Sequence, residues 1–554
     1  MSASSKKKLR KEQNAAMLTD KQQKAKAEAK KMKITTIVFV AVILAIVVTF
    51  AVVLSVNTIK NSGVFQKNTV AATVDDVELD SVEFNYYYND MLSNTYNQWY
   101  SSYGENLTAY MSLMGLDLTK PLDEQTYTMG GEEGKTWADY FVESALDRAK
   151  SDYALYNAAV AAGHEMTEAE QAELDNSLLN MSFYAQMYGF STMDQYLKAM
   201  YGPGAKESTY NEYCRKNALA TSYYNAYNAS LEYSESDIDA YEADKASDYN
   251  SYDFAYYYLN YNKFLKDGVK DDEGNVTYTD EQHAAARAEA KAVAESLLKN
   301  KSLEELDKAI SALEINKGTT VTTSKNTDAL GSSISSLYGE WLTNPGRKVN
   351  DVAMFAYEST ATDADGNKTT NVNGYYIVMF QGVSDNVRPL GNVRHLLVKF
   401  EGGTTGENNV TVYSDEEKAA AKAKAEGYLK TWQDGEATEE SFIELVKKNS
   451  QDTSASTGGL FEDISPVSQY VTNFLNWSID ETRKEGDTAV IETEYGYHVM
   501  YYVGASELNY RDSMISSDMR SEDLMEWYDG MVEKVDAAIV NTKYLDTSKV
   551  LSAE

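Results

Sequence analysis

The spacing of apolar residues along the chain changes twice, and it predicts three kinds of structure. Residues 34–59 form an apolar run of 26 residues without a charged side chain, which is long enough to cross a bilayer as a helix. From about 81 to 246, apolar residues recur at the three- to four-residue spacing of helices. From 251 onward, short alternating and aromatic runs mix with helical stretches, which predicts an α+β region.

Capping signals support the helical part of this prediction. Asp80 or Ser81 can cap a helix that carries Glu83 in its first turn. Gly163 can end a later helix. The region is rich in Tyr and Met, and the segment 506–539 again has a helical pattern. We therefore expect an all-helical domain built from N- and C-terminal parts of the chain.

The α+β region contains an internal repeat. A strand, an Ala-rich helix, a second short helix and a closing strand pair occur in residues 251–386, here called copy one, and again in residues 387–505, copy two. "WLTNPGRKVNDVAMFAYES…NGYYIVMFQGV" matches "WSIDETRKEGDTAVIETEYGYHVMYYVG" in its Trp, Arg-Lys, acidic residue, small strand and Gly-Tyr. Chance similarity is the alternative, but the shared order of these features favours a duplication.

Two of the four histidines lie within apolar strands of copy two, at His395 and His498. Copy one has Tyr376 after its Gly-Tyr pair, where copy two has His498. Four interpretations are open: packing residues bonded to backbone carbonyls, metal ligands, part of a hydrolase triad, or a polar cluster beside an apolar pocket. Ligand spacing and a G-x-S-x-G motif are missing from the sequence, which disfavours the second and third.

The fourth interpretation gains support from a family resemblance. "VRHLLVKF", "SFIELVKKNSQDTSASTGGLF" and "GDTAVIETEYGYHVMYYVG" resemble, in order, most of a parvulin-type peptidyl-prolyl isomerase domain. The resemblance implies a small antiparallel sheet surrounded by helices. By position, it implies a catalytic set of His395, Asp452 and His498, and substrate-binding residues Tyr470, Val471, Phe474, Thr493 and Tyr495.

Two features depart from the family pattern. The family often reads Gly-Gly-Asp-Leu-Gly where this chain has "GGLFEDI", so the loop can differ in shape. Phospho-specific parvulins carry a basic cluster after the first strand, whereas this chain has "EGGTTGENN". We therefore do not expect selection for phosphoserine before proline.

The whole chain resembles extracytoplasmic foldases of the PrsA and SurA type, in which parvulin domains are inserted into a helical chaperone domain. The resemblance implies an α+β protein with two parvulin-like domains, the first of them degenerate. The expected domains are a basic cytoplasmic tail (1–33), a transmembrane helix (34–59), the N-terminal part of the chaperone domain (60–250), the degenerate parvulin-like domain (251–386), the isomerase domain (387–505) and the C-terminal part of the chaperone domain (506–554).

Charge predicts the topology of the chain. Residues 1–33 carry eleven basic and three acidic side chains, a net of +8, whereas the whole chain has a net charge of −34. Basic flanks stay in the cytoplasm, so we expect a single-pass membrane protein with its bulk outside. A cleaved signal peptide is the alternative. The acidic bulk argues against nucleic acid and anionic lipid as partners.

Cofactor and metal motifs are missing from the sequence, so we expect neither kind of ligand. Cys214 is the only cysteine, and we expect a small buried side chain without a disulfide. The function expected is a foldase that binds unfolded or partly folded secreted proteins and isomerises their Xaa–Pro bonds. An inactive holdase and a structural envelope protein are alternatives, and the sequence leaves a homodimer open.

Overall fold

The computed structural model describes residues 59–129, 134–270, 274–362, 368–406 and 410–551, with short pieces at 4–8, 10–11, 42–43 and 49. The expected transmembrane helix 34–59 therefore lies almost entirely outside the described residues. Within these ranges, no helix combines the length and the apolar character needed to span a bilayer. The described part is a mixture of helices and β-sheets, as the sequence predicted.

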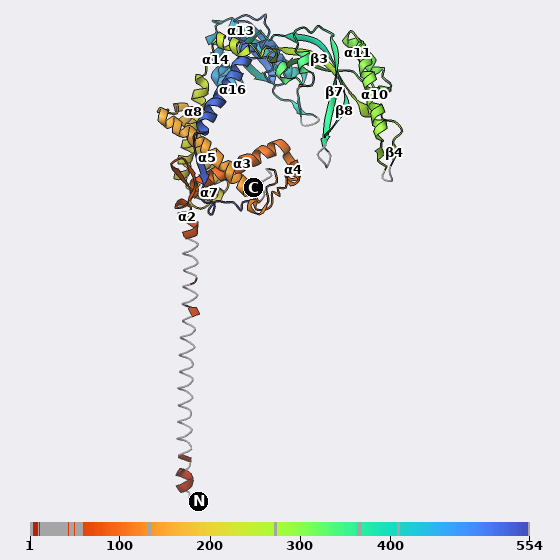
Figure 1. Cartoon of the computed structure of the whole chain (residues 1–554). Coiled ribbons are helices and arrows are strands. Elements are labelled where there is room, and N and C mark those ends of the chain that lie inside the picture. Colours follow the sequence, from red (N-terminus) through yellow and green to blue (C-terminus); the bar gives the residue numbers. More distant parts are fainter. Residues whose placement is uncertain are drawn as a thin grey trace. The chain divides into compact units, whose positions relative to one another are not determined.

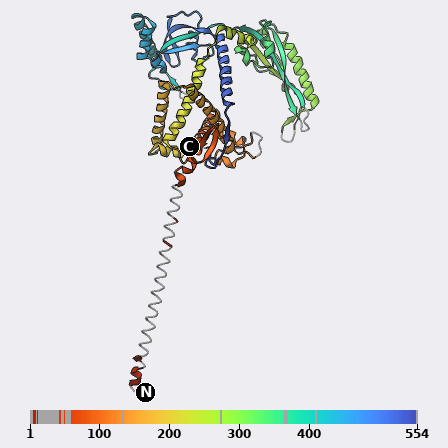
Figure 2. The ribbon, with the colours of Figure 1, turned by 60° about the vertical axis from the view of Figure 1, so that its left-hand side comes forward.

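The chain divides into two compact units. Unit 1 comprises Met1–Leu231 and Asp523–Glu554, and unit 2 comprises Glu232–Glu522. Both ends of the chain therefore belong to unit 1, and unit 2 is a continuous insertion (Figure 1). The second boundary falls inside helix α16 (Tyr510–Val532), the long blue helix of Figure 2.

Unit 1 is mainly helical. Asp80 caps helix α3 by accepting hydrogen bonds from the backbone N–H groups of Val82 and Glu83, as predicted. Gly163 adopts a left-handed conformation that ends α5. The helices enclose a core rich in tyrosine. They are α3 (Ser81–Tyr103), α4 (Leu107–Leu113), α5 (Trp137–Ala162), α6 (Glu168–Met187), α7 (Met193–Tyr201) and α8 (Glu207–Ser230).

The prediction of an all-helical unit was wrong, because unit 1 also contains a small antiparallel sheet. Its strands are β1 (Val70–Val74), β2 (Val77–Asp80) and β15 (Ala537–Ile539), in the order β15–β1–β2. β15 has three residues, which is too short to give an alternating pattern, and pairing with β1 determines its conformation.

Unit 2 begins with helix α9 (Glu235–Glu242) and contains two four-stranded antiparallel sheets of the same topology. The sheet of copy one has the order β6–β3–β8–β7, and that of copy two has the order β12–β9–β14–β13. Counted within each copy, both sheets read second, first, fourth, third strand, so the predicted repeat is present in the fold. The strands of copy one are β3 (Ser251–Asn260), β6 (Ser324–Leu330), β7 (Val352–Thr362) and β8 (Lys368–Ser384).

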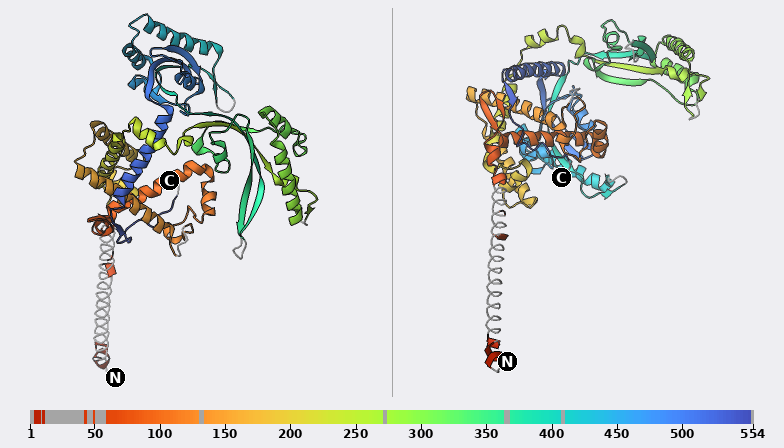
Figure 3. Two further views of the ribbon diagram at one scale, coloured as in Figure 1. Left: turned by 45° about the horizontal axis from the view of Figure 1, so that its top comes forward. Right: turned by 60° about the horizontal axis from the view of Figure 1, so that its bottom comes forward.

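Copy two uses the corresponding strands β9 (Pro389–Lys399), β12 (Leu460–Ile464), β13 (Thr488–Thr493) and β14 (Gly496–Asn509). Each sheet has one face covered by two helices: α10 (Asp280–Leu297) and α11 (Leu303–Ser311) in copy one, and α13 (Asp415–Gln433) and α14 (Glu439–Asn449) in copy two. Figure 3 shows α10 beside the long strands β7 and β8.

The second face of each sheet carries a separate cluster. In copy two, Val393, Met500 and Tyr502 pack against helix α15 (Thr472–Ser478). Side chains alternate between the faces of a strand, so His395 and His498 share this face with Val393 and Met500. The equivalent face of copy one packs against the short helix α12 (Gly339–Leu342).

Candidate active site in copy two

The register between β9 and β14 brings the two histidines together. His395 lies opposite Met500, and His498 lies opposite Leu397, so the histidines are diagonal neighbours on one face of the sheet. Their Nδ1 atoms are 2.8 Å apart, and their rings are almost parallel, with an interplanar angle of 19°. Both are buried, with exposed fractions of 2% and 4%.

Asp452 and Ser454 contact the outer nitrogen of His395. Oδ1 of Asp452 lies 3.5 Å from Nε2 of His395, and Oγ of Ser454 lies 3.3 Å from the same nitrogen. The Ser454 hydroxyl donates to Asp452 Oδ1 at 2.6 Å. His395, together with the hydrogen bonds from Ser454, holds the pKa of the Asp452 carboxyl well below its usual value despite partial burial. This end of the site therefore carries a fixed negative charge.

Thr493 contacts the outer nitrogen of His498. Its Oγ1 lies 2.9 Å from Nε2 of His498 and accepts a hydrogen bond from the backbone N–H of Tyr495 at 3.2 Å. Gly496, paired with Thr493 in the β13–β14 ladder, has a φ of +149°, and a Cβ there would lie 2.1 Å from the carbonyl oxygen of Val398. The turn that places Thr493 therefore requires glycine.

The four polar side chains form a continuous chain of contacts from Thr493 to Asp452. Burial first, and the neighbouring His395 second, lower the pKa of His498 to about 3, so His498 is neutral at pH 7. The carboxylate of Asp452 can only accept hydrogen bonds, which assigns a proton to Nε2 of His395. One proton bridges the Nδ1 atoms of the two rings, and the Thr493 hydroxyl completes the chain of contacts at Nε2 of His498.

An aromatic wall lies beside the histidines. The ring of Phe474 is 5.3 Å from that of His395 and 5.7 Å from that of His498. Phe461 is 5.1 Å from His395. Tyr470 contacts both phenylalanines, at 5.5 Å and 5.4 Å, and is 39% exposed. The wall therefore reaches from the buried imidazoles to the surface.

Phe461 was missed by the sequence analysis, which treated "GGLF" only as a departure from the family pattern. The signal that could have found it is the strand after the two glycines: β12 pairs with β9, and Phe461 lies opposite Val393. The second glycine of the pair, Gly459, is required here, because a Cβ there would lie 2.2 Å from the carbonyl oxygen of His395. The altered loop thus keeps its close approach to β9.

The remaining predicted residues differ in their positions. Val471 packs partly buried in the cluster that contains Phe474. The side chain of Tyr495 is 57% exposed, and this residue contacts the network through its backbone N–H. Next to Thr493 and Asn473, a hollow of about 530 Å³ opens on the surface. This hollow is large enough for a few residues of a polypeptide next to the histidine pair.

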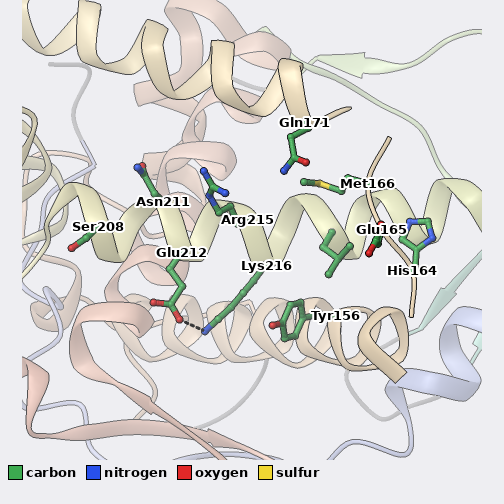
Figure 4. A pocket seen from close by; sticks show the side chains of 11 residues that line it. Tyr156, His164, Glu165, Met166, Gln171, Ser208, Asn211, Glu212, Arg215 and Lys216 are labelled. Carbon is green, nitrogen blue, oxygen red and sulfur yellow. Dashed lines mark ion pairs between the residues drawn. The ribbon is translucent and has the colours of Figure 1, made fainter. Parts of the chain in front are cut away.

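Unit 1 contains a separate hollow of about 710 Å³. Figure 4 shows it between α8, α5 and the start of α6, with the side chains of Tyr156, Gln171 and Arg215 around it. The Lys216 ammonium at its edge is held by Glu83 and by the Tyr153 hydroxyl, each at 2.9 Å. The hollow is thus polar. Among the described residues, no group of three or more His, Cys, Asp or Glu side chains is arranged to hold a metal ion.

Comparison with known proteins identifies the segment that contains the histidine pair. Residues 395–504 match the family model described as "Rotamase: PPIC-type PPIASE domain". No curated protein matches the chain. The chain therefore contains a peptidyl-prolyl cis–trans isomerase domain of the parvulin type.

Solved structures similar to this chain include isomerases and a PrsA protein. The PPIase domain of TbPar42 is 23% identical, covers 20% of this chain and is itself covered to 98%, with a TM-score of 0.17. Peptidyl-prolyl isomerase ESS1 from Candida albicans is 22% identical over 21% of this chain and 63% of that chain, with a TM-score of 0.16. PrsA from Bacillus subtilis is 14% identical over 74% of this chain and 93% of that chain, with a TM-score of 0.25.

The low pKa of His498 predicts how the protonation of this ring, and the stability linked to it, depend on pH. Because its folded value of about 3 lies below the ordinary value near ~6.5, the folded state does not take up this proton between about pH 7 and pH 4. The stability that His498 contributes is complete above about pH 6.5 and is lost as the pH falls toward 3. NMR of ¹⁵N-labelled imidazoles should show a His498 signal without an inflection in this range.

The His498→Asn variant identifies the signal, since it removes one imidazole and leaves the other three. An inflection of the His498 signal near pH ~6.5 would show that the ring is open to water and that the network described above is wrong.

Proposed function

We propose that this chain is a membrane-anchored extracytoplasmic foldase, which binds unfolded secreted proteins and isomerises their Xaa–Pro bonds at copy two. The observation that carries the proposal is the continuous chain of polar contacts from Asp452 through His395 and His498 to Thr493. It lies beside an aromatic wall, in the segment that matches the PPIC-type domain.

The chemistry required is rotation about one bond. A peptide bond resists rotation with a barrier of about 20 kcal/mol, and an Xaa–Pro bond takes tens to hundreds of seconds unaided. A catalyst needs only to bind the twisted amide more tightly than either planar form. The wall of Phe461, Tyr470 and Phe474 suits a proline ring, and it excludes water from the amide beside it.

The histidines act here by position and not by proton transfer. Each ring uses both of its nitrogens within the network: His395 contacts Asp452 and His498, and His498 contacts His395 and Thr493. His498 is also too weak a base to be protonated at neutral pH. The pair therefore forms a fixed array of dipoles next to the twisting amide, and Asp452 orients it from one end.

Unit 1 offers a surface for holding unfolded chains. Helix α6 and its C-cap residue carry a stripe of exposed apolar side chains, with exposed fractions between 50% and 67%: Leu179, Phe183, Tyr184, Met187 and Tyr188. A contiguous exposed apolar surface is typical of binding sites, and Met and aromatic side chains adapt to different partners. A second copy of this chain is the alternative occupant of the stripe, which would make the protein a homodimer.

The location outside the membrane rests on the sequence. The apolar run 34–59 would span the bilayer, and the basic segment 1–33 would stay in the cytoplasm. This topology presents the acidic remainder to chains as they leave the membrane. The alternative function is a holdase in which both copies bind but neither catalyses.

Isomerase activity is tested with the full chain and a short Ala–Pro peptide, whose cis–trans exchange is followed by NMR. We expect His395→Ala and Asp452→Ala each to lower the rate enhancement by roughly tenfold or more, because each breaks the polar chain beside the amide. His283→Ala is the matched control, since His283 lies in copy one and contacts Tyr261. A folded wild-type chain without any enhancement would favour the holdase.

The holding role is tested by the aggregation of an unfolded client protein. The double variant Phe183→Ser, Met187→Ser should raise the chain concentration needed for half-suppression by roughly threefold, because it removes much of the apolar area of the α6 stripe. Asn180→Ser, an exposed polar change on the same helix, is the control. Equal suppression by both variants would place client binding elsewhere.

The topology is tested by adding protease to intact cells that express the chain. We expect unit 2 to be degraded, while an epitope placed within residues 1–33 is protected until the membrane is broken. Protection of unit 2 in intact cells would refute the proposed location.

A further inference from the structure

The shared strand order allows the two copies to be compared residue by residue. In copy two, Gly496 pairs with Lys399 and Met500 pairs with His395. In copy one, Gly374 pairs with Asn260 and Val378 pairs with Tyr256. Counting from the two glycines, Tyr376 takes the place of His498, and Tyr256 takes the place of His395. Copy one thus has a tyrosine at each histidine position.

Two further aromatic residues occupy equivalent places. Tyr357 pairs with Gly374, just as Thr493 pairs with Gly496. Tyr338 precedes Trp341 by three residues, and Phe474 precedes Trp477 by the same number. Three of the four residues of the polar chain in copy two, and one residue of its wall, therefore correspond to tyrosines in copy one.

These tyrosines form a cluster around Tyr376. Its ring centroid is 5.9 Å from those of Tyr256 and Tyr338 and 6.1 Å from that of Tyr357, with an interplanar angle of 89°. Tyr258 packs closest, at 4.8 Å. The same face also holds Phe254, whose ring contacts Tyr338 and Tyr256.

The cluster is more open than the histidine pair. Tyr256 and Tyr376 are half-buried, and Tyr357 is 46% exposed, whereas both histidines of copy two are buried. In the part of the chain that the structure describes, the hydroxyls of Tyr256 and Tyr376 have no hydrogen-bond partner. These two hydroxyls are thus available to a ligand.

The change from histidine to tyrosine alters the chemistry of the site. Phenols have an ordinary pKa near ~10, and burial raises those of Tyr258 and Tyr338 above it. The phenols of Tyr258 and Tyr338 are therefore uncharged at neutral pH, and the Asp452 carboxylate of copy two has no counterpart among these tyrosines. What remains is a set of ring faces and hydroxyl donors.

We propose that copy one binds proline-rich extended segments on this face without isomerising them. Such segments adopt a polyproline II conformation, whose backbone carbonyls make no internal hydrogen bonds and can accept from tyrosine hydroxyls. Their proline rings pack on aromatic faces, which is how aromatic-lined grooves recognise them. The ligand is an uncharged proline-rich stretch of an unfolded chain. The proposal goes beyond the isomerase function, since it concerns a separate face of the protein.

The test uses the full chain carrying Phe474→Ala, which truncates the aromatic wall of copy two. The probe is a fluorescein-labelled decapeptide rich in proline, and its Kd is measured by fluorescence anisotropy. We expect Tyr376→Ala, and separately Tyr357→Ala, to raise the Kd by about tenfold, as loss of an aromatic residue at the centre of a binding site does. Tyr357 is exposed, so its variant keeps the test valid if Tyr376→Ala fails to fold.

Tyr278→Ala is the matched control, because Tyr278 lies in copy one and contacts His283, away from the cluster. An unchanged Kd in the folded Tyr357→Ala and Tyr376→Ala variants would overturn the proposal. Equal binding of a decapeptide with every proline replaced by alanine would also overturn it. The proposal would also be overturned if the chain formed a dimer that Tyr357→Ala dissociates, because a second copy of the chain would then cover the tyrosine face of copy one.

Exchange of the Ala–Pro peptide by the chain with Phe474 intact reports on copy two alone. A protein that binds the decapeptide but does not accelerate the exchange would refute the isomerase function and support the binding face. A protein that accelerates the exchange but does not bind the decapeptide would support the isomerase function and refute the binding face.

Discussion

The antiparallel pairing of β9 with β14 is the constraint on which the candidate active site depends. A shift of this register by one residue would turn one histidine to the opposite face of the sheet, toward α13 and α14. The register is held on both sides: Gly496 lets β14 approach Val398, and Gly459 lets the loop before β12 approach His395. Two close backbone contacts thus determine where two imidazoles meet, and the polar chain from Asp452 to Thr493 follows from that meeting.

The two copies show that one backbone can carry two kinds of surface. Their sheets share a strand order, and both bury an apolar face under helices that contribute alanines to the core. Only the second face differs, with imidazoles and a carboxylate in one copy and tyrosines in the other. The packed face maintains the fold, so the second face was free to change without loss of the core.

The sequence predicted the parts of the site that carry rare or strongly patterned residues. His395 and His498 stood out because histidines are few and these two interrupt apolar strands, and the resemblance to parvulins indicated Asp452 and Phe474. Ser454 and Phe461 were missed, because their contacts depend on how a turn and an edge strand fold back onto β9. β15 was missed for a related reason: three residues have too little pattern of their own, and their partner lies at the other end of the chain.

Unit 1 is built from both ends of the chain, and this arrangement determines the order in which the protein can assemble. β15 completes the sheet with β1, and Leu545 and Leu551 are buried in the core of unit 1. A chain that emerges from its N-terminus onward therefore exposes an unfinished core in unit 1 until residues 537–551 have been made, whereas unit 2 can fold earlier. Once folded, unit 2 replaces a long flexible loop with a compact body, which lowers the entropy cost of joining the two ends.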